Sequence, residues 1–543
     1  MTPPRASLVL RGQVVVAALP DRLETADAIG IAGGRVVSAG RDRDVVDAAA
    51  PGATVIDARD AAIVPGIHDF HLHLVGMARA RRALQLDAAA DYGELVEVVS
   101  RRAEQLPAGE WLTGRGWSEA SLDAAELSRL EAAVGERPAF LVSHDGHSAW
   151  ASAQARRRAR LSAATADPSG GRLERDPSGA PNGILREAAT ELVGVIAGRL
   201  QSEPLGAAID ETLAEMSAMG ITGATDAGDY DDANGIGAYA ELGDSFSSLA
   251  ELASGIEPRL RLTLDIPAGA IEAAARRGLR TGAPVVGLRF GWAKAYADGA
   301  LGSRTAALFA PYSCAEGAGS GMLRLGPERL REIIGAGRAA RIGLAIHAIG
   351  DRAAAAVLDA IEAAPPRLGD VAVDRLEHAQ LVRPVDRDRF AALGVTASMQ
   401  PIHAPADRAA VERCWAGRAG HAFAWRSLAD AGALLAFGSD APVETANPWL
   451  GLFAACRRRY PAEGSDQGWH LEQAIDPVAA LSAYTLGPAR TIGAPDEGHL
   501  RPGAHADLAI LSIDLPTLLA ADERLASAHA DLTLVAGQET HRS

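Results

Sequence analysis

Six side chains of kinds that bind metal ions stand at the ends of short apolar segments: His71, His73, Lys294, His347, His378 and Asp440. His71 and His73 are two residues apart, so a strand would project both imidazoles from the same face. Imidazole nitrogens and carboxylate oxygens are preferred ligands of zinc, and three or four of them leave a position for water. The set therefore predicts a metal centre that activates water for hydrolysis.

Each of these residues also has an ordinary structural interpretation. A His-x-His pair on a strand is more often a surface or hydrogen-bonded pair than a ligand pair, and Asp440 in GSDAP could cap a following helix. His347 and His378 could each be a core histidine whose hydrogen bonds are satisfied. The metal interpretation depends on their conjunction, because all of them fall at the same end of different predicted strands.

Lys294 lies in RFGWAKAYADG, where strand alternation places Trp292, Tyr296 and Asp298 on its own face. Burial among aromatic rings disfavours an ammonium group and lowers its pKa. A neutral amine can react with carbon dioxide to form a carbamate, whose oxygens could bridge two metal ions. The alternative is an ordinary salt bridge from Lys294 to Asp298 or Asp440.

The segments that must position these residues alternate between strand-like and helix-like patterns. The apolar segments that end in polar residues are 62–74, 220–228, 259–266, 287–299, 342–351, 373–381, 394–403 and 433–442. Ala- and Arg-rich helical stretches separate most of them. This alternation predicts an α/β protein with a parallel (β/α)8 TIM-like barrel, and a doubly wound sheet is the structural alternative.

Both ends of the chain carry β-patterns of their own. SLVLRGQVVV near the start and DLAILSID near the end are typical, and neither end has enough strands for a stable sheet alone. We therefore expect a small β-sandwich built from residues 1–62 and 495–543. The hydrolase barrel would span 63–494. A segment at about 85–210 exceeds what one crossover requires, and we expect this insertion to cover the barrel mouth like a lid.

The composition argues against several kinds of partner. The chain has 69 acidic and 53 basic residues and a net charge of -16, which disfavours nucleic acid. No apolar run approaches the roughly 20 residues of a membrane-spanning helix, and the first residues lack the pattern of a signal peptide. Cys314, Cys414 and Cys456 are widely separated and predict neither a disulfide framework nor a CxxC metal site. We expect a soluble cytoplasmic protein, and a homodimer is the default expectation for its oligomeric state.

The motifs together resemble those of the amidohydrolase superfamily. HLHL, AKAYADGALGSRTAALFAPY, HAIGDRA, RLEHAQ, SMQPIHA, GSDAPV and RPGAHADLAILS carry the resemblance, which covers nearly the whole chain. More specifically, the sequence resembles the branch that includes N-substituted formamide deformylase and related metal-dependent hydrolases. WLTGRGW (111–117) and PAFLVSHDGHSAW (138–150) in the insertion are similar to that branch as well.

The resemblance implies a role for each candidate ligand. Asp440 would bind metal and act as the base that takes a proton from the attacking water. Lys294, as its carbamate, would bridge two ions, although relatives differ in using one divalent ion or two, with zinc the expected metal. The histidines are implied in pairs, one pair for each ion: His71 with His73, and His347 with His378.

Five further residues are candidates for supporting roles. His403 in SMQPIHA and His147 in DGHSAW could donate to the substrate carbonyl or to the developing oxyanion. Glu377 and Asp351 could hold the histidines in the required tautomer. Arg304 could bind an acidic group of the substrate or pair with a carboxylate of its own loop.

The predicted activity is hydrolysis of an amide or formamide-like carbon–nitrogen bond in a small molecule. Hydrolysis of an ester, carbamate or cyclic amide is an alternative, because the same chemistry serves all of them. A deaminase would usually have a glutamate soon after His347, whereas the sequence there is HAIGD. A catalytically inactive binding barrel is a further alternative, but such a protein normally loses a ligand and none is missing here.

Overall fold

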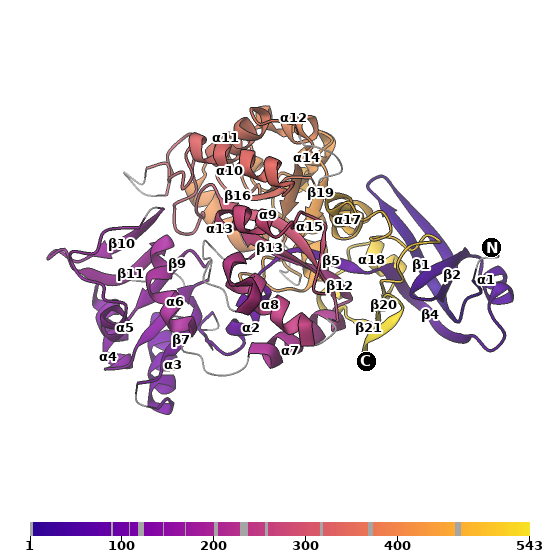
Figure 1. Cartoon of the computed structure of the whole chain (residues 1–543), viewed down its shortest axis with the longest axis horizontal. Coiled ribbons are helices and arrows are strands. Elements are labelled where there is room, and N and C mark those ends of the chain that lie inside the picture. The colour runs from indigo at the N-terminus through magenta and orange to yellow at the C-terminus, as the bar shows by residue number, and fades with distance from the viewer. Residues whose placement is uncertain are drawn as a thin grey trace.

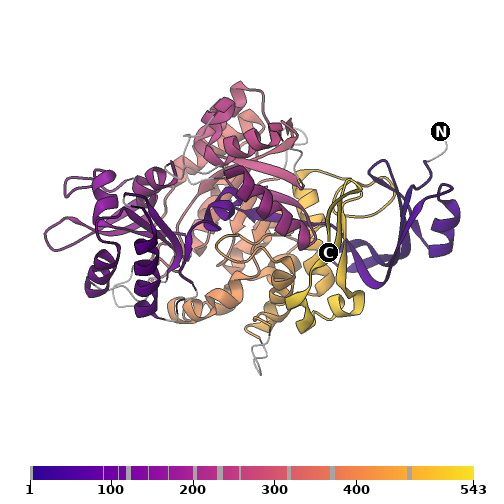
Figure 2. The same ribbon diagram turned by 90° about the horizontal axis from the view of Figure 1, so that it is seen from below.

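The described part of the chain forms three β-sheets that lie side by side along the molecule, with helices packed around them (Figure 1). The computed structural model describes residues 4–543 except 88, 90, 108, 118–123, 145, 169, 200–204, 229–236, 256–258, 315–318, 367–372 and 462–467. The barrel occupies the middle, the inserted segment one end, and the sheet built from the two chain ends the other (Figures 1 and 2).

The central sheet is the predicted barrel. Its parallel strands are β5 (Ile67–Leu72), β12 (Ile221–Asp226), β13 (Arg261–Pro267), β15 (Leu288–Tyr296), β16 (Leu344–Ala348), β17 (Arg375–His378), β18 (Thr396–Met399) and β19 (Leu435–Phe437), and β14 (Pro284–Val285) pairs with β15. The first and last strands meet just beyond their ends. The Asp440 amide donates to the His71 carbonyl at 2.7 Å, and the His73 amide donates to the Ala441 carbonyl at 2.8 Å. These hydrogen bonds close the barrel at His71, His73 and Asp440, three of the predicted metal ligands.

Helices cover the outside of the barrel. They are α2 (Leu74–Ala80), α7 (Leu205–Ala218), α8 (Asp244–Gly255), α9 (Ile271–Arg276), α10 (Pro327–Ala340), α11 (Asp351–Glu362), α12 (Pro384–Leu393), α13 (His403–Cys414), α14 (Trp425–Asp430), α15 (Pro448–Arg457), α16 (Pro477–Tyr484) and α17 (Leu486–Ile492). In α10 the helix begins at Pro327, and Leu330, Ile333, Ile334 and Gly337 are buried at helical spacing. None of the described helices has the length and apolar character that crossing a membrane requires.

The two chain ends build one seven-stranded sheet. Its strands are β1 (Leu8–Leu19), β2 (Arg22–Ala32), β3 (Arg35–Gly40), β4 (Thr54–Pro65), β20 (Leu508–Asp514), β21 (Ala530–Val535) and β22 (Gln538–Arg542), with α1 (Asp42–Ala48) and α18 (Leu515–Leu519) beside them. β4 joins the two halves, because it pairs parallel with β1 and antiparallel with β20. Apolar side chains from both ends, including Leu10, Ile63 and Leu508, share one buried cluster. The sheet thus joins the segments that precede and follow the barrel.

The inserted segment forms a six-stranded sheet with helices of its own. Its elements are β6 (Leu84–Gln85), α3 (Tyr92–Gln105), β7 (Leu112–Trp117), α4 (Ala124–Val134), β8 (Ala139–Ser143), β9 (Ser148–Ala151), α5 (Ala153–Arg158), β10 (Gly171–Arg175), β11 (Pro181–Glu187) and α6 (Glu191–Arg199). Val99, Leu141 and Trp150 belong to a buried apolar cluster within this segment. A sheet with a core of its own can hold a rigid surface against the barrel.

Cys314 and Cys414 form a disulfide although they are 100 residues apart in the sequence. The prediction that the cysteines form no disulfide is wrong. The long loop after β15 lies against the end of α13, where the Ser313 amide donates to the Cys414 carbonyl at 3.0 Å. Sequence spacing does not reveal which loops of a barrel meet, so this pairing could not be predicted.

Candidate metal centre and its cavity

The polar side chains at the carboxyl ends of the barrel strands converge on one cavity of about 380 Å³, here called the central cavity. It is lined by the six predicted ligands, His71, His73, Lys294, His347, His378 and Asp440. Residues spread over most of the chain are thereby brought to one place. This is the arrangement expected for side chains at the same end of parallel strands.

His71, His378 and Asp440 form the tightest group, because each offers a ligand atom and these atoms all lie within 4.8 Å of one another. Asp440 Oδ1 lies 3.4 Å from His71 Nε2 and 3.4 Å from His73 Nε2. Lys294 Nζ lies 3.4 Å from His71 Nε2. Nitrogen donors from four residues and one carboxylate thus lie close together, which is a suitable donor set for a divalent ion.

His347 adjoins this group without being part of it. Its ring lies 4.5 Å from the His378 ring, centre to centre, and 5.3 Å from that of Tyr296. His347 Nε2 is 3.2 Å from the Gly299 carbonyl oxygen, to which it can donate. In that arrangement Nδ1 is the nitrogen of His347 that remains for a metal ion.

Glu377 holds His71 from behind the cluster. The fully buried Glu377 carboxylate accepts a hydrogen bond from His71 Nδ1, which leaves Nε2 directed at Asp440. Arg375 Nε lies 2.6 Å from the other Glu377 oxygen. The Arg375 guanidinium lies 4.6 Å from the Phe70 ring centre and 4.4 Å from the Trp292 ring centre. Glu377 therefore has the tautomer-fixing position predicted for it.

Two further histidines near Asp440, His73 and His378, are fixed through their Nδ1 atoms. His73 Nδ1 donates to the Gly228 carbonyl and His378 Nδ1 to Gln400 Oε1, each at 2.9 Å. Sequence reasoning missed Gln400, although it lies within SMQPIHA directly after β18, and a polar residue at the end of a strand is the signal that marked the ligands. Asp351 does not take this role, since its carboxylate accepts from the Phe309 amide at 2.9 Å.

Burial favours the neutral form of four nitrogen donors, those of His71, Lys294, His347 and His378. For His73, burial is outweighed by the hydrogen bond to Asp440, which raises the pKa. It lowers the pKa of His71 to about 4 and that of His347 and His378 well below the ordinary histidine value. Burial also lowers the pKa of the Lys294 amine. Neutral imidazoles and a neutral amine are the forms that bind a metal ion or react with carbon dioxide.

Asp440 is the negative charge among these donors. Burial raises its pKa, but hydrogen bonds from His403 and His73 outweigh burial, so the pKa lies well below the usual range. His403 begins α13, and its Nε2 lies 3.3 Å from Asp440 Oδ2. Burial lowers the pKa of His403, but the hydrogen bond to Asp440 outweighs this effect and raises the pKa to about 9. His403 therefore contacts the candidate base.

His147 reaches the central cavity from the inserted segment. Its Nδ1 donates to Glu187 Oε2 at 2.9 Å, and its ring lies 5.5 Å from the His347 ring. The buried Glu187 carboxylate also accepts from Ser303 Oγ at 3.2 Å and from Thr305. Glu187 thus connects the insertion to the loop after β15. No sequence motif predicted this role.

Arg304 lies outside the central cavity. Its exposed side chain lines another cavity, of about 370 Å³, between the loop after β15 and the inserted segment. The central cavity is instead walled on this side by residues of β7, β8 and α6, including Arg115, Phe140 and Ala197. The insertion therefore supplies a wall of the same cavity that holds the candidate ligands.

Comparison with known proteins gives one consistent family. Residues 54–541 match the model of the amidohydrolase family. YtcJ of Bacillus subtilis, named as an amidohydrolase, is 30% identical over 469 residues, covering 86% of each chain. N-substituted formamide deformylase of Arthrobacter pascens is 28% identical over 529 residues, covering 91% of each. The crystal structure of an uncharacterised metal-dependent hydrolase from Pyrococcus horikoshii is similar with a TM-score of 0.74 at 26% identity, covering 95% of this chain and 99% of that one.

Proposed function

The chain belongs to the amidohydrolase family, and from that premise we propose that it hydrolyses the carbon–nitrogen bond of an amide or formamide-like small molecule. One observation carries the proposal. The ligand atoms of His71, His378 and Asp440 lie within 4.8 Å of one another in a cavity of about 380 Å³. A cavity of that size falls within the range of roughly 300–1,000 Å³ that is typical of small-molecule sites.

The donor set fits zinc or a similar divalent ion, because neutral imidazoles and one carboxylate are the ligands that such an ion prefers. His71, His73, His378 and Asp440 would hold it, so that His378 joins the first pair instead of pairing with His347 on a second ion. Lys294 and His347 adjoin this group and could contribute to a second ion. When bound, such an ion polarises a carbonyl group and makes water more acidic. Similarity to a metal-dependent hydrolase over 95% of this chain supports the same assignment.

We propose further that Lys294 carries a carbamate in the active protein. The amine lone pair would form a bond to the carbon of carbon dioxide, and the displaced N–H proton would pass to water. Full burial of Lys294, with its lowered pKa, supports this proposal. Asp298 does not compete for the amine, since its carboxylate accepts from the amides of Ala307, Ile349 and Gly350 at 2.8–3.0 Å.

The residues of the chain then divide the work of hydrolysis. Asp440 takes a proton from the attacking water and returns it to the leaving nitrogen. Burial raises the pKa of Glu187, but His147 and its other partners lower it by more, so Glu187 is an anion that favours the imidazolium form of His147. An imidazolium donates from both nitrogens, and His147 can therefore donate to the substrate oxygen while it is held by Glu187.

The test is a substrate screen with zinc-loaded protein against N-formyl, N-acyl, carbamate, lactam and ester libraries, with metal-free protein as the control. We expect turnover of an amide or formamide by the zinc-loaded protein alone. Release of ammonia from a ring amidine, with no amide turnover, would instead identify a deaminase. Protein that takes up no stoichiometric metal and turns nothing over would be a binding barrel.

The prediction of a cytoplasmic location loses one of its supports. Disulfides are rare in cytosolic proteins, and Cys314 and Cys414 form one. The expectations of a homodimer and of no nucleic-acid partner stay predictions.

A further inference from the structure

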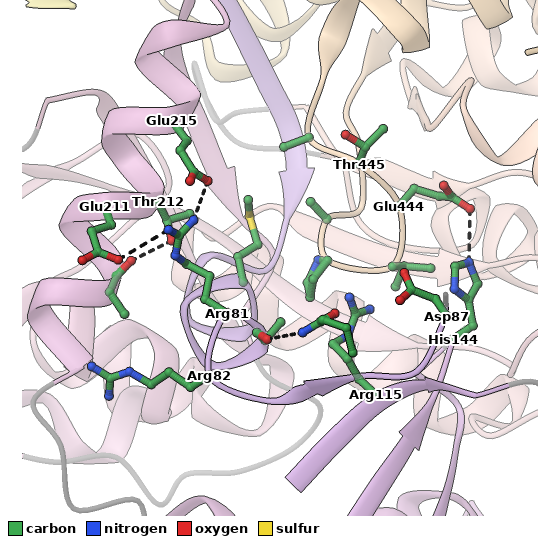
Figure 3. Close-up of a pocket in the computed structure, with 18 of the residues that line it drawn as sticks. Arg81, Arg82, Asp87, Arg115, His144, Glu211, Thr212, Glu215, Glu444 and Thr445 are labelled. Atoms are coloured by element: carbon green, nitrogen blue, oxygen red, sulfur yellow. Dashed lines mark hydrogen bonds and ion pairs between the residues drawn. The ribbon is translucent and has the colours of Figure 1, made fainter. Parts of the chain in front are cut away.

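Arg115 lies on β7 where the central cavity adjoins a larger one. The larger cavity, here called the outer cavity, has a volume of about 900 Å³ and is shown in Figure 3. Arg115 lines both cavities, together with Ala80, Pro442 and Val443. A ligand that extends from the central into the outer cavity must therefore pass this guanidinium.

The Arg115 guanidinium has no ion pair or hydrogen bond within the part of the chain that the structure describes. Burial lowers its pKa, and the nearby charges of Asp87 and Glu444 offset this effect only in part. Glu444 is instead paired with His144, at 3.3 Å (Figure 3). A partly buried guanidinium without a carboxylate partner is costly, and this cost falls when an anion binds.

Two other arginines at these cavities are already neutralised. Arg79 is paired with Asp244 and Arg81 with Glu215, both at 2.5 Å. Arg115 is also held in place by its strand. Gly116 has φ +93°, and a Cβ there would lie 2.9 Å from the Asp87 amide nitrogen, so β7 packs directly against this segment.

We propose that Arg115 binds a carboxylate of the substrate while the scissile amide lies against Asp440. The inference rests on the proposed hydrolase function and narrows its substrates to amides that carry a carboxylate on an apolar stem, such as N-acyl amino acids. The planar guanidinium suits a carboxylate because two parallel N–H groups can donate to its two oxygens. Phe140 and Val142, which also line the central cavity, offer apolar contacts to the stem.

The test uses pairs of hydroxamates, which bind metal centres. One member of each pair is a neutral alkanohydroxamate, and the other has the same chain ending in a carboxylate. Several chain lengths are needed so that one of them spans from the candidate ligands to Arg115. Dissociation constants are measured by titration calorimetry on zinc-loaded wild type, Arg115→Leu, Arg115→Lys and Arg329→Leu. Arg329 is the matched control, an exposed arginine of α10 paired with Glu332 at 2.9 Å.

In wild type the terminal carboxylate should strengthen binding at least about tenfold at one chain length, which corresponds to about 1.4 kcal/mol. This gain should disappear in Arg115→Leu, shrink in Arg115→Lys and persist in Arg329→Leu. Unchanged binding of the neutral hydroxamate to Arg115→Leu would establish that this variant is folded. If it is not folded, Arg115→Lys decides, and a full gain in that variant overturns the inference.

Two results separate this inference from the proposed function. If neutral hydroxamates bind the wild type but the carboxylate adds nothing at any length, or adds as much in Arg115→Leu, the role of Arg115 is wrong and the metal centre stands. If neutral hydroxamates fail to bind zinc-loaded wild type at all, the proposed function fails and the inference fails with it.

Discussion

The buried Glu377 carboxylate offers the sharpest test of how the candidate centre is held. It accepts from His71 Nδ1 and lies 2.6 Å from Arg375 Nε. Glu377→Gln keeps the shape of the side chain and removes its charge. The amide can present N–H to His71 Nδ1, which would move the ring proton to Nε2, the nitrogen that faces Asp440. A protonated Nε2 cannot bind metal.

The magnitude follows from two separate effects. Loss of a partner that orients a ligand weakens metal binding by about 10–100-fold, or about 1.4–2.7 kcal/mol. Breaking a buried ion pair costs about 3–5 kcal/mol. Arg375 retains its contacts with Asp265 and the Phe70 carbonyl. We therefore expect the free energy of unfolding to fall by about 3 kcal/mol, the lower limit for a broken buried ion pair.

Zinc affinity is measured by competition with a chromophoric chelator, and stability by denaturant unfolding of the metal-free protein. The matched control is Glu332→Gln, at an exposed glutamate paired with Arg329, where we expect a change of no more than about 1 kcal/mol. If Glu377→Gln binds zinc as tightly as the wild type, the reasoning about His71 is refuted, whatever happens to stability.

Four further predictions concern the residues around the cluster. Asp440→Asn should lower kcat by at least about 10²-fold while much of the zinc remains bound; near-normal turnover, measured beside metal content, would exclude Asp440 as the base. Lys294→Ala should lose activity that added short-chain carboxylic acids restore in part and bicarbonate does not, and rescue by bicarbonate would argue against a carbamate on this residue. The pKa of His403 is raised to about 9. Its ion pair with Asp440 therefore stabilises the metal-free protein fully below the ordinary histidine pKa, and this stabilisation is lost as pH rises through about 9. The melting temperature of metal-free wild type should therefore fall more between neutral and strongly alkaline pH than that of His403→Gln, and equal falls would contradict the pairing. Glu187→Gln should reduce kcat/KM without loss of zinc, because His147 loses its anionic partner; unchanged kcat/KM would remove His147 from the reaction.

The barrel and the residues at its strand ends could be predicted from the sequence because the two signals coincide. Each barrel strand is a short, mostly apolar run, and polar residues stand near or just beyond its carboxyl end, as in β16, where LAIHA contains His347. Parallel strands place such ends together, so the meeting of His71 with Asp440 follows from topology alone.

Contacts that depend on how loops and the insertion dock could not be predicted in this way. Glu187 ends a hairpin strand of the insertion, and its contacts with His147 and Thr305 depend on where that hairpin lies against the barrel. Arg304 and Arg115 both stand in recognisable motifs. Only the structure distinguishes them, because Arg304 lies in a loop with φ +57° that turns away from the cavity, whereas Arg115 lies on a strand that faces it.

The most direct test of the central claim is an anomalous difference map, recorded at the zinc edge from crystals of the zinc-loaded protein. We predict a peak at about 2.0–2.2 Å from imidazole nitrogens of His71 and His378 and from an oxygen of Asp440. Stoichiometric zinc bound elsewhere, with these three side chains bonded only to one another, would contradict the account.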